Sequence, residues 1–159
     1  MVNKSISEVY SELSNIIGKT MSKVAHGVLF KTERGVVVYN KYVIVKTADG
    51  VDLYTRTGQE EIMSFNSAKT ALIWSILDNS LQVSAARRVR ELDTLLYSAN
   101  FDVEVHKTYK KKTKTEDYLI YYSKYQHARV RQKQFLLELD KYTILAQRCQ
   151  SKGTKHEIK

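Results

Sequence analysis

An apolar pattern between Tyr125 and Gln150, in which spacings of three and four residues alternate, constrains this chain more than any other feature. This spacing predicts an amphipathic helix over residues 125–150. Its main apolar stripe comprises Tyr125, Ala128, Gln132, Phe135, Leu139, Tyr142, Ala146 and Cys149. Only Gln132 in this stripe is polar, so we expect the stripe to be buried, with Phe135 and Leu139 in the core.

A second apolar set on the same helix, called the outer stripe below, consists of Val130, Leu137 and Ile144. These residues repeat every seven positions and, at about 100° per residue, lie nearly opposite the main stripe. The outer stripe should therefore be covered either by another element of this chain or by a partner. Basic residues border it and favour a partner interface: Arg129, Lys133, Lys141 and Arg148.

The length of 159 residues suits a single domain that buries its own core. The one cysteine, Cys149, excludes an intramolecular disulfide and, because it belongs to the main stripe, is expected to be a buried thiol. The N-terminal residues contain no apolar signal segment, and no apolar run is long enough to span a membrane. We therefore expect a cytoplasmic protein that is neither secreted nor bound to a membrane.

The first part of the chain predicts a helix followed by a sheet. Ser5 and Glu8 form a capping-box pattern, which predicts a helix over residues 5–26. Segments rich in Val, Ile and Tyr then alternate with turn residues, which predicts an antiparallel β-meander over residues 28–56. The expected turns are Arg34-Gly35, Asn40-Lys41 and Ala48-Asp49-Gly50. Residues 61–65 are expected to add one short strand.

Residues 67–99 predict two helices or one kinked helix, interrupted at residues 78–80. Asn66 or Ser67 is the expected N-cap, and Asn100 is the expected C-cap. Together with the preceding segments, this pattern predicts an α+β fold: an N-terminal helix, a β-meander, central helices, a β-hairpin and the long C-terminal helix.

Residues 101–123 supply the expected β-hairpin, because Phe101, Val103 and Val105 alternate with polar residues. The alternative is a helical hairpin, whose last helix would begin near Glu116. That helix would extend about 50 Å, longer than the diameter of roughly 40 Å of a compact domain of this size. The strand interpretation avoids this overhang and is preferred. Residues 151–159 are expected to form a flexible tail.

The net charge of +9 is concentrated in the second part of the chain, and its strongest local signal is a basic segment around Tyr109. Five lysines belong to it: Lys107, Lys110, Lys111, Lys112 and Lys114. On a loop, these groups would neutralise phosphates without sequence preference, and Tyr109 would stack on an exposed base. The alternative is a solvated loop tip that keeps the hairpin soluble. The sequence leaves these two interpretations about even.

Patterns typical of catalysis and cofactor binding are absent from the sequence. The four histidines, His26, His106, His127 and His156, are far apart, and none belongs to a zinc-binding spacing. There is no glycine-rich dinucleotide motif, P-loop or nucleophile elbow. We therefore expect a non-enzymatic protein without a cofactor, metal or small-molecule substrate.

Two segments carry a resemblance to a known group of proteins: VVVYNKYVIVKTADGVDLYTRTG at residues 36–58 and YLIYYSKYQHARVRQKQFLLELDKY at residues 118–142. In composition over its whole length, the chain resembles small accessory proteins of tailed bacteriophages, especially marine relatives of the T-even group. The resemblance implies a virion or assembly component that works through subunit contacts and lacks catalytic residues. It contains no motif that assigns a role to a single residue.

We therefore expect a structural or assembly protein that binds protein subunits, either its own copies or a larger particle. It would act in the cytoplasm of the host cell or in the virion. The alternative is a nucleic-acid-binding accessory protein that uses the basic segment around Tyr109. An enzyme whose active site is assembled from residues far apart in the sequence stays open as a third class.

Overall fold

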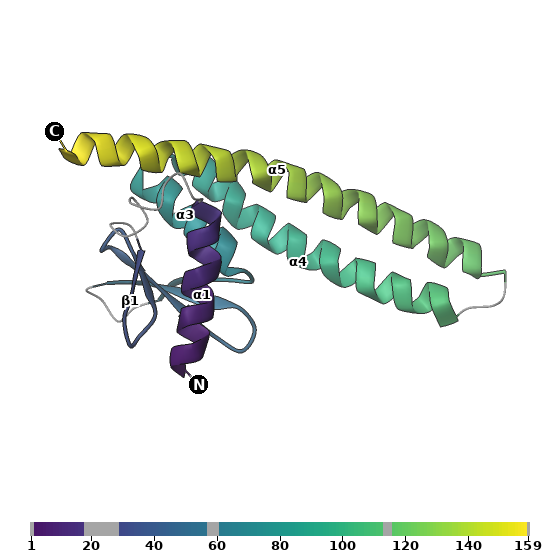
Figure 1. The fold of residues 1–159 in the computed structure, drawn as a ribbon. Coiled ribbons are helices and arrows are strands. Elements are labelled where there is room, and N and C mark those ends of the chain that lie inside the picture. The colour runs from purple at the N-terminus through teal and green to yellow at the C-terminus, as the bar shows by residue number, and fades with distance from the viewer. Residues whose placement is uncertain (1, 18–28, 57–60, 113–115, 159) are drawn as a thin grey trace.

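The computed structural model of the chain describes residues 2–17, 29–56, 61–112 and 116–158. A five-stranded antiparallel sheet and its covering helices form a body, from which two long helices project side by side (Figure 1). The predicted α+β class is therefore confirmed. The two projecting helices give the molecule an elongated shape that the sequence interpretation did not anticipate.

The helices and strands follow one another along the chain as α1 (Val2–Ile17), β1 (Leu29–Lys31), β2 (Val36–Val38), β3 (Tyr42–Lys46), β4 (Val51–Thr55), β5 (Glu61–Phe65), α3 (Ala68–Asn79), α4 (Val83–Lys112) and α5 (Tyr118–Ile158). The strands pair in sequence order, each antiparallel to its neighbours. The predicted meander is thus confirmed, with the strand at residues 61–65 as its last member.

The connection between β2 and β3 is a three-residue hairpin loop, residues 39–41, across which Val38 pairs with Tyr42. Tyr39 and Asn40 have φ values of 54° and 56°, and the Lys41 N–H donates to the Val38 carbonyl at 3.0 Å. Positive φ at both central residues is the type I′ geometry, which matches the twist of the flanking strands. The predicted turn at Asn40-Lys41 is therefore confirmed, and the loop also includes Tyr39.

Gly35 and Gly50 lie where the backbone of another strand approaches too closely for a side chain. A Cβ at Gly35 would lie 2.3 Å from the Ile44 carbonyl oxygen, and a Cβ at Gly50 would lie 2.3 Å from the Phe65 carbonyl oxygen. Only glycine tolerates such contacts without a shift of the backbone. These two turn residues therefore also fix how closely the strands pack.

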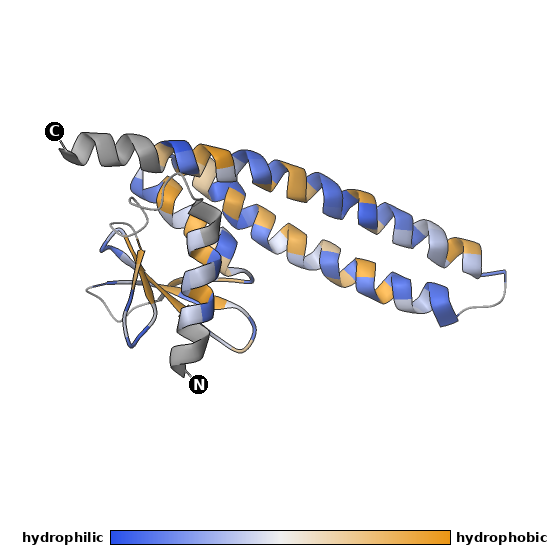
Figure 2. Ribbon diagram, viewed as in Figure 1, coloured by the Kyte–Doolittle hydropathy of each residue, from blue (hydrophilic) through white to orange (hydrophobic). Residues whose placement is uncertain are grey.

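One face of the sheet packs against α1 and α3, and this interface forms the core. The sheet contributes Leu29, Val36, Val38, Tyr42, Ile44, Val51, Leu53 and Phe65. Leu13 of α1 and Leu72 and Leu77 of α3 are fully buried against them. Burying each large apolar side chain stabilises the fold by about 1.5 to 3 kcal/mol. Figure 2 shows hydrophobic residues concentrated in the middle of the sheet, whereas hydrophobic and hydrophilic residues alternate along α4 and α5.

A buried carboxylate of α4 is bonded to the residues at the start of α3. Asp93 of α4 accepts hydrogen bonds from the Asn66 backbone N–H at 2.9 Å and from the Thr70 hydroxyl at 2.6 Å. Ser67 has extended backbone angles, and its hydroxyl accepts from the Lys69 N–H, so it is the N-cap of α3. Of the two predicted caps, Ser67 is the correct one. Because Asp93 is buried, these hydrogen bonds are needed to offset its desolvation.

The boundaries of α1 differ from the prediction. The helix begins at Val2, so Ser5 lies within it and does not form the predicted capping box with Glu8. It is described as far as Ile17, and the predicted continuation through His26 lies outside the described residues. A capping pattern by itself does not exclude a helix that begins one turn earlier, since boundaries also depend on packing.

The predicted β-hairpin at residues 101–123 is wrong. The chain is helical up to Lys112 and again from Tyr118, so Asn100 lies inside α4 and is not a C-cap. The rejected helical hairpin is the correct interpretation. The overhang is tolerated because α4 and α5 cover each other's apolar residues, as Val103 and Ala128 show by their burial. The apparent two-residue period arises because Phe101, although apolar, is exposed.

The predicted end of the last helix is also wrong. α5 continues to Ile158, so residues 151–158 are helical and do not form the flexible tail expected from the sequence. At about 1.5 Å per residue, its 41 residues extend roughly 60 Å, which is longer still than the helix that the sequence interpretation rejected for its length. The break before α4 was predicted correctly, since α3 ends at Asn79 and Leu81 has a φ of 63°.

Candidate interaction surfaces

The main stripe of α5 is its inner face, as predicted. Ala128, Leu139, Ala146 and Cys149 are buried, and the remaining members are half-buried. Leu139 and Phe135 both pack against the core, although Phe135 keeps part of its surface in water. The predicted orientation of the helix is therefore confirmed, together with the burial of the Cys149 thiol.

Near the body, a bidentate ion pair joins α5 to α4. Arg88 donates from Nε to one Glu138 carboxylate oxygen at 2.6 Å and from a terminal nitrogen to the other at 2.9 Å. Arg88 also pairs with Glu91 at 2.9 Å. The hydrogen bonds from Arg88 hold the pKa of Glu138 below its usual value of 4.5. This geometry fixes the rotation of α5 about its own axis, which is what determines where the outer stripe points.

Farther along the two helices, polar contacts continue the pairing. The Gln132 side chain donates to Asn100 at 2.7 Å, which explains why the one polar residue of the main stripe is accommodated there. Arg131 pairs with Asp102 at 3.3 Å, with both side chains partly exposed. These contacts orient the outer part of α5 in the same way as the part next to the body.

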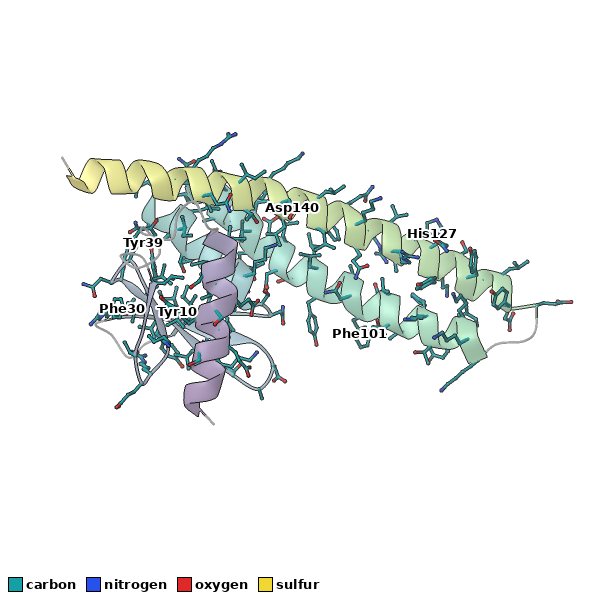
Figure 3. The ribbon with its side chains drawn as sticks, viewed as in Figure 1. Tyr10, Phe30, Tyr39, Phe101, His127 and Asp140 are labelled. Carbon is teal, nitrogen blue, oxygen red and sulfur yellow. The ribbon has the colours of Figure 1, made fainter. Side chains whose placement is uncertain are left out.

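The outer stripe is exposed along its whole length. Val130, Leu137 and Ile144 keep 53%, 55% and 50% of their surface accessible. Figure 3 shows a row of side chains on the side of α5 that faces away from α4, with nothing above them. The possibility that another described element of this chain covers the stripe is therefore excluded. The predicted partner interface stays a prediction, and the surface that it requires is present.

The flanks of the outer stripe are charged and open. The predicted basic residues Arg129, Lys133, Lys141 and Arg148 are all exposed. Asp140 is exposed on the same flank as Lys133, one heptad further along, and the sequence interpretation did not single it out. A shallow depression lies on this flank and is lined by Gln126, Arg129, Val130, Gln132, Lys133 and Leu136. The surface thus combines an apolar centre with a polar rim.

The far end of the helix pair carries a cluster of tyrosine rings and cations, called the tip below. Tyr109 of α4 stacks on Tyr121 of α5, with ring centroids 5.4 Å apart. Lys110 places its Nζ 4.4 Å from the Tyr125 ring centroid. Tyr118 and Tyr122 stack on each other one turn apart, at 6.1 Å. Among the described residues of the tip, these contacts are made without any large buried aliphatic side chain.

The predicted anion-binding lysines do not lie on a loop between strands. Lys107, Lys110, Lys111 and Lys112 belong to the end of α4, and Lys114 lies outside the described residues. Lys110 is engaged with tyrosine rings, whereas Lys111 and Lys112 are exposed. Lysines in the last turn also interact favourably with the negative end of the helix dipole. Their presence is therefore explained in part without a ligand.

The sequence interpretation missed other exposed apolar side chains, and it placed all of them except Tyr97 in the predicted β-hairpin. Leu119 and Ile120 are exposed beside the tip, and Tyr97 and Phe101 are exposed on α4. Figure 3 shows Phe101 pointing away from α5. The signal that would have identified them is helical periodicity over residues 83–112, in which Tyr97 and Phe101 fall outside the buried set.

Polar clusters in the body have structural roles. The Tyr42 hydroxyl donates to the Asp78 carboxylate, and burial together with this bond raises the pKa of Tyr42 above its usual value of 10.0. A depression between the sheet and α4 is lined in part by Asp52, Ser64 and Arg90, but Asp52 accepts from Ser64 and Arg90 donates to Asp93. Within the described ranges, no three His, Cys, Asp or Glu side chains are grouped to hold a metal ion.

None of the helices in the part of the chain that the structure describes combines the length and apolar character required to cross a bilayer. Comparison of the chain with protein family models, curated proteins and solved structures finds no match. The resemblance to bacteriophage accessory proteins therefore stays a prediction from the sequence.

Proposed function

We propose that this chain is a non-enzymatic structural or assembly protein that binds another protein subunit through the outer stripe of α5. The observation that carries the proposal is the exposure of Val130, Leu137 and Ile144 on a helix whose opposite face is already buried. Association would remove this surface from water, which stabilises by roughly 25 cal/mol per Å² of apolar area. A helix face that stays in contact with water is normally polar, so aliphatic residues at every seventh position favour a covered face.

The surroundings of the stripe also support an interface. Charged side chains on both flanks, including Lys133, Asp140 and Lys141, surround the apolar centre. An apolar centre within a polar rim is the usual arrangement in protein–protein interfaces. In the setting implied by the bacteriophage resemblance, the subunit would act during virion assembly in the host cytoplasm.

Replacing Leu137 with Lys tests the proposal. Because Leu137 is exposed, the variant should retain its free energy of unfolding within about 0.5 kcal/mol. Association should be abolished, since a charge would be buried at the centre of the interface. Sedimentation velocity of the chain, both purified and in an extract of its source cells, should show the parent in complexes and the variant as a monomer. Ser98→Lys is the matched control, because Ser98 is exposed on α4, away from the outer stripe, and gains the same charge.

The proposal is wrong if parent and Leu137→Lys sediment alike in both samples, because the outer stripe would then have no partner to lose. It is also wrong if Ser98→Lys abolishes association as completely as Leu137→Lys does. That result would mean that the added charge, wherever it lies, and not the apolar surface of α5, governs association.

A second candidate function, nucleic-acid binding, is favoured by the composition of the tip. Tyrosine rings and exposed cations lie together at the end of a projecting helix pair, where a strand could reach them. Aromatic rings and ammonium groups are the side chains that bind single-stranded nucleic acid without sequence preference. This candidate is placed second because the rings stack on one another and Lys110 lies against two of them, and it leaves the outer stripe unexplained.

The double substitution Lys111→Gln/Lys112→Gln tests this second candidate, and Lys31→Gln/Lys46→Gln on the sheet removes the same charge elsewhere. If the tip binds nucleic acid, only the first pair should flatten the dependence of affinity on salt, by up to about one unit of log–log slope for each phosphate that is no longer neutralised. We expect the parent to bind weakly and only at low salt. Sub-micromolar binding near about 0.15 M salt that the tip substitutions abolish would reverse the order of the two candidates.

A further inference from the structure

We infer that the subunit on the outer stripe is a second copy of this chain, whose α5 runs antiparallel to the first with a twofold axis passing at Leu137. This inference rests on the proposed function, because it names the occupant of the same surface. The symmetry of the stripe and the charges beside it both support a second copy.

The apolar residues of the outer stripe are spaced symmetrically about Leu137. Val130 lies seven residues before Leu137 and Ile144 lies seven residues after it, and all three are about half exposed. In an antiparallel pair centred on Leu137, the two Leu137 side chains meet, and each Val130 faces Ile144 of the second copy. A twofold interface requires such a self-complementary surface, since the same patch serves both partners.

The charges on one flank complete this complementarity. Lys133 lies four residues before Leu137 and Asp140 lies three after it, on the same flank of the helix. In an antiparallel twofold pair the same flanks of the two helices meet. Lys133 of one copy then lies within about one residue rise, roughly 1.5 Å along the axis, of Asp140 of the other. Two equivalent ion pairs result, from exposed side chains that form no ion pair with another described residue of their own chain.

Next to Leu137, the opposite flank brings no like charges together in this arrangement. Lys141 lies four residues after Leu137 and comes level with Gln134 of the second copy, so that no like charges face each other there. A parallel pair would instead place both tips side by side. Lys111 and Lys112 of each copy are exposed at that end, and their repulsion would oppose the parallel arrangement.

The shape of the molecule leaves room for the second copy. The body and α4 lie on the inner side of α5, and the outer side is open along the helix (Figure 1). The depression beside Val130 lies on the flank with Lys133 and Asp140, and it receives the aliphatic side chain of Ile144 of the second copy. Because the stripe is short, the pair dissociates on dilution, so its formation has to be followed as a function of concentration.

Charge reversal within this flank tests the inference on the full chain. Lys133→Asp faces Asp140 of the second copy, and Asp140→Lys faces Lys133, so each variant alone should raise the dissociation constant of self-association about tenfold to hundredfold. The effect is large because each reversal acts twice in a symmetric pair. The double variant Lys133→Asp/Asp140→Lys should restore association, and an equimolar mixture of the two single variants should form a mixed dimer. Lys141→Asp is the control, since it faces Gln134.

Disulfide cross-linking provides a second measurement that does not depend on charge. In a Cys149→Ser background, Val130→Cys and Ile144→Cys variants should cross-link when mixed, whereas neither should cross-link alone. A parallel pair would give the reverse, because Val130 would then face Val130.

The outcomes distinguish this inference from the proposed function. Restored association in the double variant, with the mixed cross-link, supports the antiparallel pair. If the purified parent stays monomeric while Leu137→Lys still abolishes complexes in the cell extract, the second copy is overturned and another subunit occupies the stripe. The antiparallel register is overturned if the charge reversals leave the dissociation constant of self-association unchanged. It is also overturned if the Val130→Cys variant forms a cross-link by itself. No association in either sample overturns both.

Discussion

The body and the far part of the helix pair are stabilised by different kinds of contact. In the body, the sheet buries Leu, Val and Ile side chains completely against α1 and α3. In the distal hairpin, defined as residues 99–112 and 118–132, the buried residues within the described ranges are Ala99, Val103 and Ala128. The distal hairpin instead relies on tyrosine stacking and on polar contacts such as Asn100 with Gln132.

The two ends of one helix pair should therefore differ in stability. Next to the body, α4 and α5 are backed by α3 and tied by Arg88 and Glu138. In the distal hairpin, α4 and α5 pack against each other without support from another described element. The buried Nδ1 of His106 there has no hydrogen-bond partner among the described residues. Segments with little buried apolar surface open at lower free energy than the core. The tip should therefore open without unfolding of the sheet.

The largest expected effect lies in the body. Leu72→Ala removes a fully buried side chain of α3 and leaves a cavity against the sheet, so the free energy of unfolding should fall by about 2 to 5 kcal/mol. Urea denaturation followed by the signal of Trp74 measures this decrease. A change below about 0.5 kcal/mol would mean that α3 does not fill the centre of the core.

A smaller and local effect is expected in the distal hairpin. Ala128 is fully buried where α5 faces α4, so Ala128→Leu should force the helices apart at a cost of about 1 to 3 kcal/mol. Hydrogen exchange should accelerate around residues 99–112 and 118–132 and stay unchanged in β3 and β4. Uniform acceleration across the sheet would show that the two regions unfold together and that the helix pair has a single level of stability. Gln126→Leu, at a half-buried neighbouring position, serves as the control for added bulk.

Tyr42→Phe probes a polar contact of the body and should cost about 1 to 2 kcal/mol at neutral pH, because Asp78 loses a donor. Burial and the bond to Asp78 raise the pKa of Tyr42 above 10.0. The unfolded chain therefore loses this proton near pH 10 while the folded chain keeps it, so stability falls as pH rises beyond that value. The variant should lack this part of the alkaline loss. Tyr97→Phe, on an exposed ring, should behave like the parent in urea denaturation between pH 7 and about 11.

The smallest effect is expected at the ion pair between the two helices. Glu138→Gln should cost at most about 1 kcal/mol, because the Arg88 and Glu138 side chains are 34% and 30% exposed and solvent screens them. The pKa of Glu138 is held below 4.5, so its contribution is present above that pH and is lost as pH falls through the depressed value. The difference between parent and variant should therefore shrink in acid. Glu104→Gln, on the exposed side of α4, should show no such pH dependence.

The candidate surface was predictable in part. Heptad spacing within α5 placed Val130, Leu137 and Ile144 opposite the main stripe, and this needs only the geometry of one helix. The sequence interpretation did not single out Asp140, because its proposed pairing with Lys133 requires that a second copy on the outer stripe be inferred first. The stacking of Tyr109 on Tyr121 could not be predicted from the sequence either, because it depends on two helices that the sequence did not identify as neighbours.

The residue order by itself determined the elements whose stabilising contacts are local: the meander, the cap at Ser67 and the two apolar faces of α5. Tight turns, caps and helical periodicity involve residues a few positions apart, so their signals survive in the sequence. By contrast, the helical structure of residues 101–112 and the exposure of the outer stripe follow from tertiary contacts. These features depend on contacts between residues far apart in the sequence, such as Asn100 with Gln132 and Arg88 with Glu138. The free energy of such contacts outweighs the weak local preference for strand structure that a short apolar alternation provides.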